Sequence, residues 1–315
     1  MSASGKTLVV AALLMVGSTL GCSAPSLSEE GLAQGNQELV ADDGFSINGL
    51  ATNGLATNGL ATNGLATNGL ATNGLQSESF SSWFSADLEQ RNVLMRYLVG
   101  CALRQDEVRT YTDPDTGETY TWYGKLGLAP RWSSGEPATE VEEQVISACL
   151  AAHANPYGVK VDFSILGRTA EGKEIPYTAE EMVDYSIPEA CFFGNLFREE
   201  GLYAGNDHMQ LDASQSTVRG CGLSSVESGT NPVCPVIARV GTCNPSLCER
   251  DPSGMYYTQC TYNGVSYRPV TTRIQYASLY TCGDGICQVS EKCGEGGTPD
   301  SCSDCGPCQA GVADR

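Results

Sequence analysis

The chain has 315 residues, a formal net charge of −19 and 15 cysteines, and 41% of its residues are hydrophobic. This composition suits one or two globular domains and excludes a fibre or a transporter. The acidic residues are spread along the chain and no segment forms a basic patch. We therefore expect no nucleic-acid partner, because phosphate binding needs a basic face.

The first residues indicate an export signal. Lys6 precedes the apolar run of residues 8–16, which is too short to span a bilayer but typical of a secretory signal. The following Thr19-Leu20-Gly21-Cys22 resembles a bacterial lipoprotein signal, although Thr19 stands where an aliphatic residue is usual. The resemblance implies that residues 1–21 are removed and that Cys22 carries lipid, which anchors the chain to a membrane. An ordinary secretory signal cut near Ala24 is the alternative, with the protein then secreted.

Residues 22–45 form an acidic tether, and residues 46–75 follow as a low-complexity repeat in which Asn-Gly-Leu recurs six times at a period of five. Asn-Gly favours turns, and regularly spaced leucines would stack inward if these turns coiled. A repeat array needs several stacked units before it buries a core. We interpret the repeat as a mobile spacer and keep a short ordered solenoid as the alternative. The spacer interpretation predicts that deleting two units leaves the melting of the folded domain unchanged.

Residues 79–281 contain the predicted folded domain. Apolar spacing predicts a helix over 86–103 capped by Ser85, a second helix from Pro137 to Asn155, and a third after the capping box at Thr178. Thr- and Tyr-rich runs at 108–112 and 119–123 predict a hairpin, as does Asn263-Gly264 between two short runs. Alternation over 159–165 predicts a half-buried strand. Two to three helices with short antiparallel strands indicate an α+β class.

Fourteen cysteines remain if Cys22 is lipidated, an even number that predicts seven disulfides in an exported protein. Eight lie in the domain: Cys101, Cys149, Cys191, Cys221, Cys234, Cys243, Cys248 and Cys260. Six lie in the tail: Cys282, Cys287, Cys293, Cys302, Cys305 and Cys308. Cys101 and Cys149 share the apolar stripes of the first two predicted helices, so we expect them to pair. The alternative is that each is a buried free thiol or pairs with Cys191 or Cys221.

Residues 282–308 form a cysteine-rich module, followed by a tail over 309–315. Its Cys-Gly-Asp-Gly-Ile-Cys run at 282–287 resembles small C-G-D-G-x-C modules of exported bacterial and archaeal proteins. Such modules are disulfide knots, and the resemblance implies Asp284, Glu291 and Asp304 as calcium ligands. The closely spaced thiols of 302–308 allow an iron–sulfur or zinc site instead. An oxidising compartment favours disulfides over either metal site.

The sequence assigns no catalytic residue and no certain cofactor. It has two histidines, His153 at the end of the second predicted helix, where a cation suits the helix dipole, and His208 in a loop. The acidic run at 113–118 indicates a polar hairpin turn, with a calcium loop as the alternative. Six tyrosines cluster late in the domain and suit contact with a partner, although cross-strand packing is the alternative. They are Tyr256, Tyr257, Tyr262, Tyr267, Tyr276 and Tyr280.

The order of leader, Asn-Gly-Leu repeat, cysteine-bearing domain and tail resembles uncharacterised exported lipoproteins of Gram-negative, fruiting-body-forming soil bacteria. The resemblance implies an outer-membrane or cell-surface location and no activity. We expect a non-enzymatic surface binding or adhesion module whose ligand is an unknown protein or matrix component. The alternatives are an extracellular hydrolase that uses carboxylates and a structural envelope protein.

Overall fold

The computed structural model describes residues 49–52, 55, 60, 62–207, 211–212, 214–223, 234–244, 246–294 and 301–308. Four features predicted from the sequence lie outside these residues: the leader with Cys22, the acidic tether, His208 and the tail 309–315. The described residues combine helices with mostly antiparallel strands and seven disulfides. The predicted disulfide-rich α+β class is therefore confirmed.

A five-stranded sheet in the order β5-β13-β6-β7-β9 forms the centre of the domain. Its strands are β5 (Phe163–Gly167), β6 (Ile187–Asn195), β7 (Gly201–Asn206), β9 (Ile237–Thr242) and β13 (Val270–Ile274). All neighbours are antiparallel except β7 and β9, which are parallel. β5 begins at Phe163, four residues later than the sequence predicts. Asn155 is the reason, because its side chain accepts the N–H groups of Tyr157 and Val159 and holds that segment in a loop.

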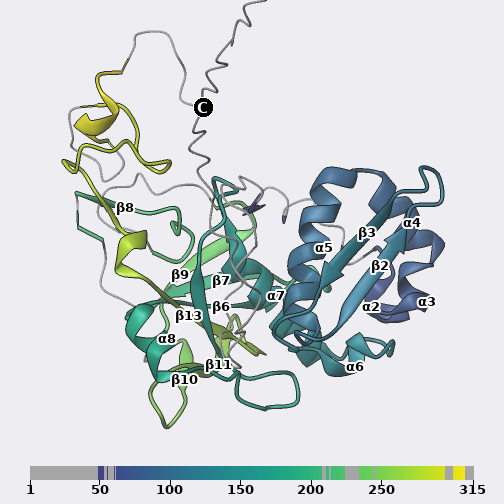
Figure 1. Ribbon diagram of the computed structural model, residues 1–315. Helices are drawn as coiled ribbons and strands as arrows, with labels where there is room; N and C mark the ends of the chain where they lie inside the picture. Colours follow the sequence, from purple (N-terminus) through teal and green to yellow (C-terminus); the bar gives the residue numbers. More distant parts are fainter. Residues whose placement is uncertain are drawn as a thin grey trace, which may run out of the picture. The chain divides into compact units, whose positions relative to one another are not determined.

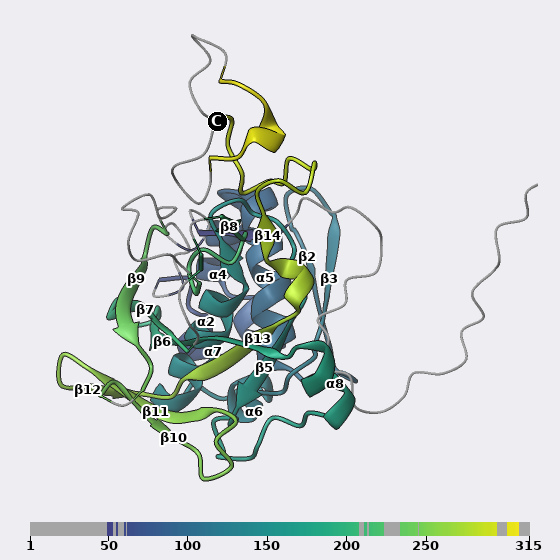
Figure 2. The same ribbon diagram turned by 90° about the vertical axis from the view of Figure 1, so that its left-hand side faces the viewer.

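Helices cover the sheet. α7 (Glu140–His153) packs on β6 and β13, and α5 (Leu88–Ala102) packs on α7 (Figures 1 and 2).

The first predicted helix, over 86–103, starts later in the structure than the sequence predicts. Ser85 is not its cap but the last residue of a separate helix, α4 (Glu78–Ser85). α5 begins after Asp87, whose carboxylate accepts the N–H of Gln90 at 3.2 Å. The shorter helices are α6 (Pro130–Ser133) and α8 (Ala179–Asp184), and α8 is capped by Thr178 as predicted.

Both predicted hairpins are confirmed. β2 (Val108–Thr112) pairs with β3 (Thr119–Tyr123), and β11 (Tyr257–Tyr262) turns through Asn263 and Gly264 into β12 (Val265–Tyr267). Both turn residues have positive φ, as a tight hairpin turn requires. β10 (Cys248–Arg250) completes that three-stranded sheet. Two further pairs are β14 (Tyr280–Thr281) with β8 (Gln215–Ser216) and β1 (Leu50–Ala51) with β4 (Ala154–Asn155).

The leucines of the repeat belong to the core of the domain. All six are between 0% and 2% exposed: Leu50, Leu55, Leu60, Leu65, Leu70 and Leu75. They lie in one apolar cluster with Phe80, Phe84 and Leu98. A mobile spacer is therefore the wrong description of these residues. Six units cannot bury their leucines alone, but here the helices that follow provide the opposite wall.

Side chains of the domain also donate hydrogen bonds to backbone carbonyls of the repeat. Trp132 Nε1 donates to Leu65 O at 2.7 Å, and Arg109 Nε donates to Leu70 O at 2.6 Å. The repeat contains two short helices here, α2 (Leu65–Asn68) and α3 (Thr72–Leu75). Gly69, at φ +81°, passes so close to Gly135 that a Cβ would lie 2.4 Å from its backbone. Glycine is therefore required at position 69 for two reasons: the positive φ and the close approach of Gly135.

Cys101 pairs with Cys149 across α5 and α7, with the Cα atoms 6.2 Å apart, as predicted. The other domain pairs are Cys191–Cys243, Cys221–Cys234 and Cys248–Cys260. The module pairs are Cys282–Cys302, Cys287–Cys305 and Cys293–Cys308. The iron–sulfur or zinc alternative is therefore wrong, because all three of its thiols lie in disulfides. No disulfide joins the domain to the module.

Candidate functional site

A groove of about 270 Å³ lies between the first turns of α7 and the β11–β12 hairpin. Its lining combines two amides, two hydroxyls, one phenol and one charge of each sign. The lining residues are Glu140, Val141, Gln144, Thr258, Gln259, Ser266, Tyr267 and Arg268. This mixture of donors and acceptors without an excess of charge suits a polar, neutral ligand.

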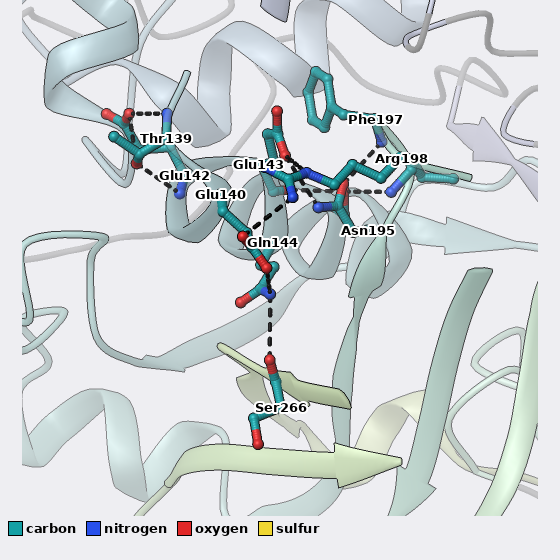
Figure 3. A network of polar contacts seen from close by, with 11 residues as sticks. Thr139, Glu140, Glu142, Glu143, Gln144, Asn195, Phe197, Arg198 and Ser266 are labelled. Atoms are coloured by element: carbon teal, nitrogen blue, oxygen red, sulfur yellow. Dashed lines mark hydrogen bonds and ion pairs between the residues drawn. The ribbon is translucent and has the colours of Figure 1, made fainter. Parts of the chain in front are cut away.

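Gln144 fixes one wall of the groove. Its side chain is buried on α7, where Nε2 donates to Ser266 O at 3.3 Å and Oε1 accepts the N–H of Arg268 at 3.0 Å. Figure 3 shows the amide reaching from α7 to the β12 backbone. Both polar ends of a buried amide are thus satisfied, so the width of the groove is set by a rigid contact between helix and strand.

The acidic residues at the start of α7 are held by hydrogen-bond and ion-pair partners. Glu143 Oε2 accepts Arg198 Nε at 2.7 Å and Asn195 Nδ2 at 3.2 Å, and Arg198 Nη1 donates to Glu140 Oε2 at 3.1 Å (Figure 3). The hydrogen bond to Glu143 raises the pKa of Arg198. Glu142 closes a capping box with Thr139. These carboxylates therefore position the helix and the groove wall.

Three tyrosines of the late-domain cluster pack inside the protein instead of forming a contact surface. Tyr256, Tyr257 and Tyr267 are at most 3% exposed, whereas Tyr276 is 70% exposed. Burial raises the pKa of Tyr267 to about 12, and its ring lies 5.8 Å from that of Phe193. These three tyrosines are therefore part of the packed interior.

His153 lies at the end of α7, but it does not act as a cation there. Burial lowers its pKa to about 3, so the ring is neutral at pH 7. Nδ1 lies 2.8 Å from Cys149 O, and the ring packs on Phe163. The predicted favourable interaction of a charged histidine with the helix dipole is therefore wrong, because desolvation outweighs it.

The acidic turn of the β2–β3 hairpin is a polar turn. Asp113 is 1% exposed, and its Oδ1 accepts the N–H groups of Asp115 and Thr116. Its Oδ2 accepts the hydroxyl of Ser85 at 3.1 Å. The hydrogen bond from Thr116 lowers the pKa of Asp113. The carboxylate is thus used to close the turn, which argues against the calcium alternative.

The three acidic residues predicted in the cysteine-rich module each accept hydrogen bonds from the segment 283–288. Asp304 accepts the N–H of Gly283 at 2.5 Å, and Asp284 accepts Gln288 Nε2 at 2.8 Å. Glu291 Oε2 accepts the N–H of Gln288 at 3.0 Å. Gln288 therefore links two of the three acids, a role that no spacing in the sequence indicated.

A buried ion pair lies under the sheet. Arg219 donates from Nε and Nη2 to the two carboxylate oxygens of Glu189, both at 2.8 Å, and both side chains are at most 1% exposed. Arg219 also donates to Ala152 O at 2.5 Å and stacks 4.2 Å from the centre of the Phe163 ring. Every side of the pair is occupied by protein groups, so we assign it a structural role.

Comparison with known proteins identifies one family model. Residues 49–75 match the GLTT repeat, in six copies. The match covers the repeat and leaves the groove and the cysteine-rich module outside it. No curated protein and no solved structure matches the chain. Within the part of the chain that the structure describes, no helix is long and apolar enough to cross a membrane.

Proposed function

We propose that this protein is an exported, non-enzymatic binding module of the cell envelope, whose groove between α7 and the β11–β12 hairpin takes a neutral glycan of the surrounding matrix. The lining of the groove carries this proposal. The exposed amide of Gln259 and the hydroxyls of Thr258 and Ser266 offer donors and acceptors to a polyhydroxylated ligand. The high negative charge of the chain would repel an acidic polymer and leaves a neutral one unaffected.

Direct binding tests the groove. We expect the wild-type protein to bind neutral oligosaccharides on a glycan array and acidic ones more weakly. Gln259→Ala removes an exposed amide from the lining and should weaken binding about two- to tenfold, since one hydrogen bond contributes about 0.5 to 1.5 kcal/mol. The matched control is Lys173→Ala, an exposed residue outside the groove, which should bind like the wild type.

Two results would contradict the glycan proposal. The first is a wild-type protein that binds no neutral oligosaccharide. The second is a Gln259→Ala variant whose affinity equals that of the Lys173→Ala control. Reproducible cleavage of a bound glycan would instead favour the hydrolase alternative, in which an Asp or Glu performs the chemistry.

We also propose that Cys22 carries the lipid that holds this module at the outer membrane. The apolar leader and the Leu-Gly-Cys sequence support this assignment. The acidic tether lies between Cys22 and the repeat, and its charge would keep the folded domain away from an anionic membrane surface.

A single substitution tests the anchor. In cells that export the protein, the wild type should partition into the detergent phase of a phase-separation assay, and Cys22→Ser should move to the aqueous phase or the medium. Loss of the acyl chains removes about 0.8 kcal/mol per buried methylene, which is enough to release the protein. Membrane association that persists unchanged in Cys22→Ser would show that another segment anchors the chain.

A further inference from the structure

The groove between α7 and the β11–β12 hairpin contains one charge that no other side chain balances. Of its two charged lining residues, Glu140 is paired, because Arg198 Nη1 lies 3.1 Å from its Oε2. Arg268, which is partly buried, forms no ion pair with any described acid, and its guanidinium has no hydrogen-bond partner within the described residues. A charged group that loses water on burial without gaining an acceptor is costly, so we expect a ligand to supply one.

The backbone holds Arg268 in a fixed place beside the groove. Its N–H donates to Oε1 of the buried Gln144 at 3.0 Å. The residues on either side, Tyr267 and Pro269, are buried, and β13 of the central sheet begins at Val270. The root of the side chain is therefore anchored before a ligand arrives, which lowers the entropy that binding would cost.

The charges around Arg268 favour a neutral acceptor over an anion. Arg168, the cation whose charge acts on Arg268, is neutralised by Asp251, with Nη2 2.8 Å from Oδ2. Glu140 lies in the same lining, and the chain as a whole carries a net charge of −19. This negative surplus would repel a carboxylate or a sulfate, whereas it leaves the hydroxyl oxygens of a neutral sugar unaffected.

We propose, building on the glycan-binding function proposed above, that Arg268 selects neutral glycans in which two adjacent hydroxyl groups are free. A guanidinium presents its N–H donors in a rigid planar fork, so two of them can donate to two neighbouring oxygens at once. The adjacent hydroxyls of a sugar ring offer such a pair of oxygens. Thr258, Gln259 and Ser266 in the same lining would contact the rest of the sugar unit.

Two neutral glucans that differ in linkage test this selection. Each main-chain unit of dextran carries three adjacent free hydroxyls, whereas the linkages of laminarin leave its main-chain units without an adjacent pair. We expect the wild-type protein to bind dextran about tenfold more tightly than laminarin in affinity electrophoresis, because a laminarin unit forgoes one hydrogen bond to a charged donor. Periodate cleaves the bond between adjacent hydroxyl-bearing carbons, so periodate-treated dextran should lose this advantage. That comparison uses the unaltered protein and does not depend on the folding of a variant.

Arg268→Lys separates the fork from the charge. Lysine keeps the positive charge but lacks the planar pair of donors, so the variant should bind dextran about tenfold more weakly and laminarin about as tightly as the wild type does. Arg96→Lys, the same change at an exposed position of α5, is the matched control and should keep the preference for dextran. Thermal unfolding of both variants checks that each is folded.

Three outcomes would overturn this inference. The first is a wild-type protein that binds neither dextran nor laminarin. The second is a preference for dextran that is absent from the wild type or persists in folded Arg268→Lys. The third is tighter binding of carboxymethyl-dextran than of dextran that is lost in Arg268→Lys, which would make Arg268 an anion site. A neutral glycan that binds without the preference leaves the proposed function standing, whereas loss of all neutral-glycan binding contradicts both.

Discussion

Replacing Leu65 by alanine is expected to lower the free energy of unfolding by about 2 to 5 kcal/mol, the range for a large-to-small change at a fully buried site. Leu65 is 0% exposed, and its carbonyl accepts the indole N–H of the buried Trp132. The substitution leaves a cavity, because the closely packed leucines around it can relax only partly. Chemical denaturation followed by tryptophan fluorescence measures the loss.

The last repeat unit offers a matched control. Asn73 belongs to α3 and is exposed, so Asn73→Ala should change stability by less than about 0.5 kcal/mol. Deleting two whole units removes two buried leucines and should lower the melting temperature clearly, the opposite of what a spacer would do. An unchanged melting temperature after this deletion would contradict the packing of the repeat on the domain.

Replacing Glu189 by glutamine is expected to destabilise the protein by about 3 to 5 kcal/mol, because it leaves the charge of Arg219 buried without a counter-charge. Glutamine keeps the shape of the side chain, so the change isolates the charge. Both carboxylate oxygens of Glu189 accept from Arg219 at 2.8 Å, and no solvent reaches the pair. The measurement is again the midpoint of denaturant unfolding at pH 7.

An exposed ion pair of the same chemistry provides the comparison. Arg131 and Glu136 lie 2.5 Å apart with side chains 57% and 53% exposed. Glu136→Gln should therefore cost only about 0 to 1 kcal/mol, the usual value for a surface pair. If Glu136→Gln and Glu189→Gln lowered the free energy of unfolding equally, burial would not be the reason that the Arg219–Glu189 pair stabilises the protein.

The groove and the acidic residues of the cysteine-rich module were open to sequence reasoning to different degrees. Asp284, Glu291 and Asp304 could be named because they share a short cysteine-rich segment with a recognisable spacing. Gln288 could not, since an amide in that segment carries no signal of its own. The groove could not be found at all, because Gln144 and Ser266 are 122 positions apart in the chain and meet only in the folded domain.

Local interactions explain what the sequence by itself determined. α7 starts at Glu140 after its cap Thr139 and not at the predicted Pro137. The β2–β3 and β11–β12 hairpins follow from turn residues, the capped start of α8 from Thr178, and the Cys101–Cys149 pair from two apolar helix stripes. Each of these signals operates within a few residues, or between two elements whose apolar faces must meet. That is why the class of the fold and these elements could be predicted.

Long-range packing decided the rest. A leucine at every fifth position matches neither the helical nor the strand period, so its burial depends on which surface the domain presents to it. The neutral state of His153 and the partner of Glu189 likewise depend on residues far along the chain. The repeat is therefore part of the core because the domain supplies the apolar wall that six repeat units lack on their own.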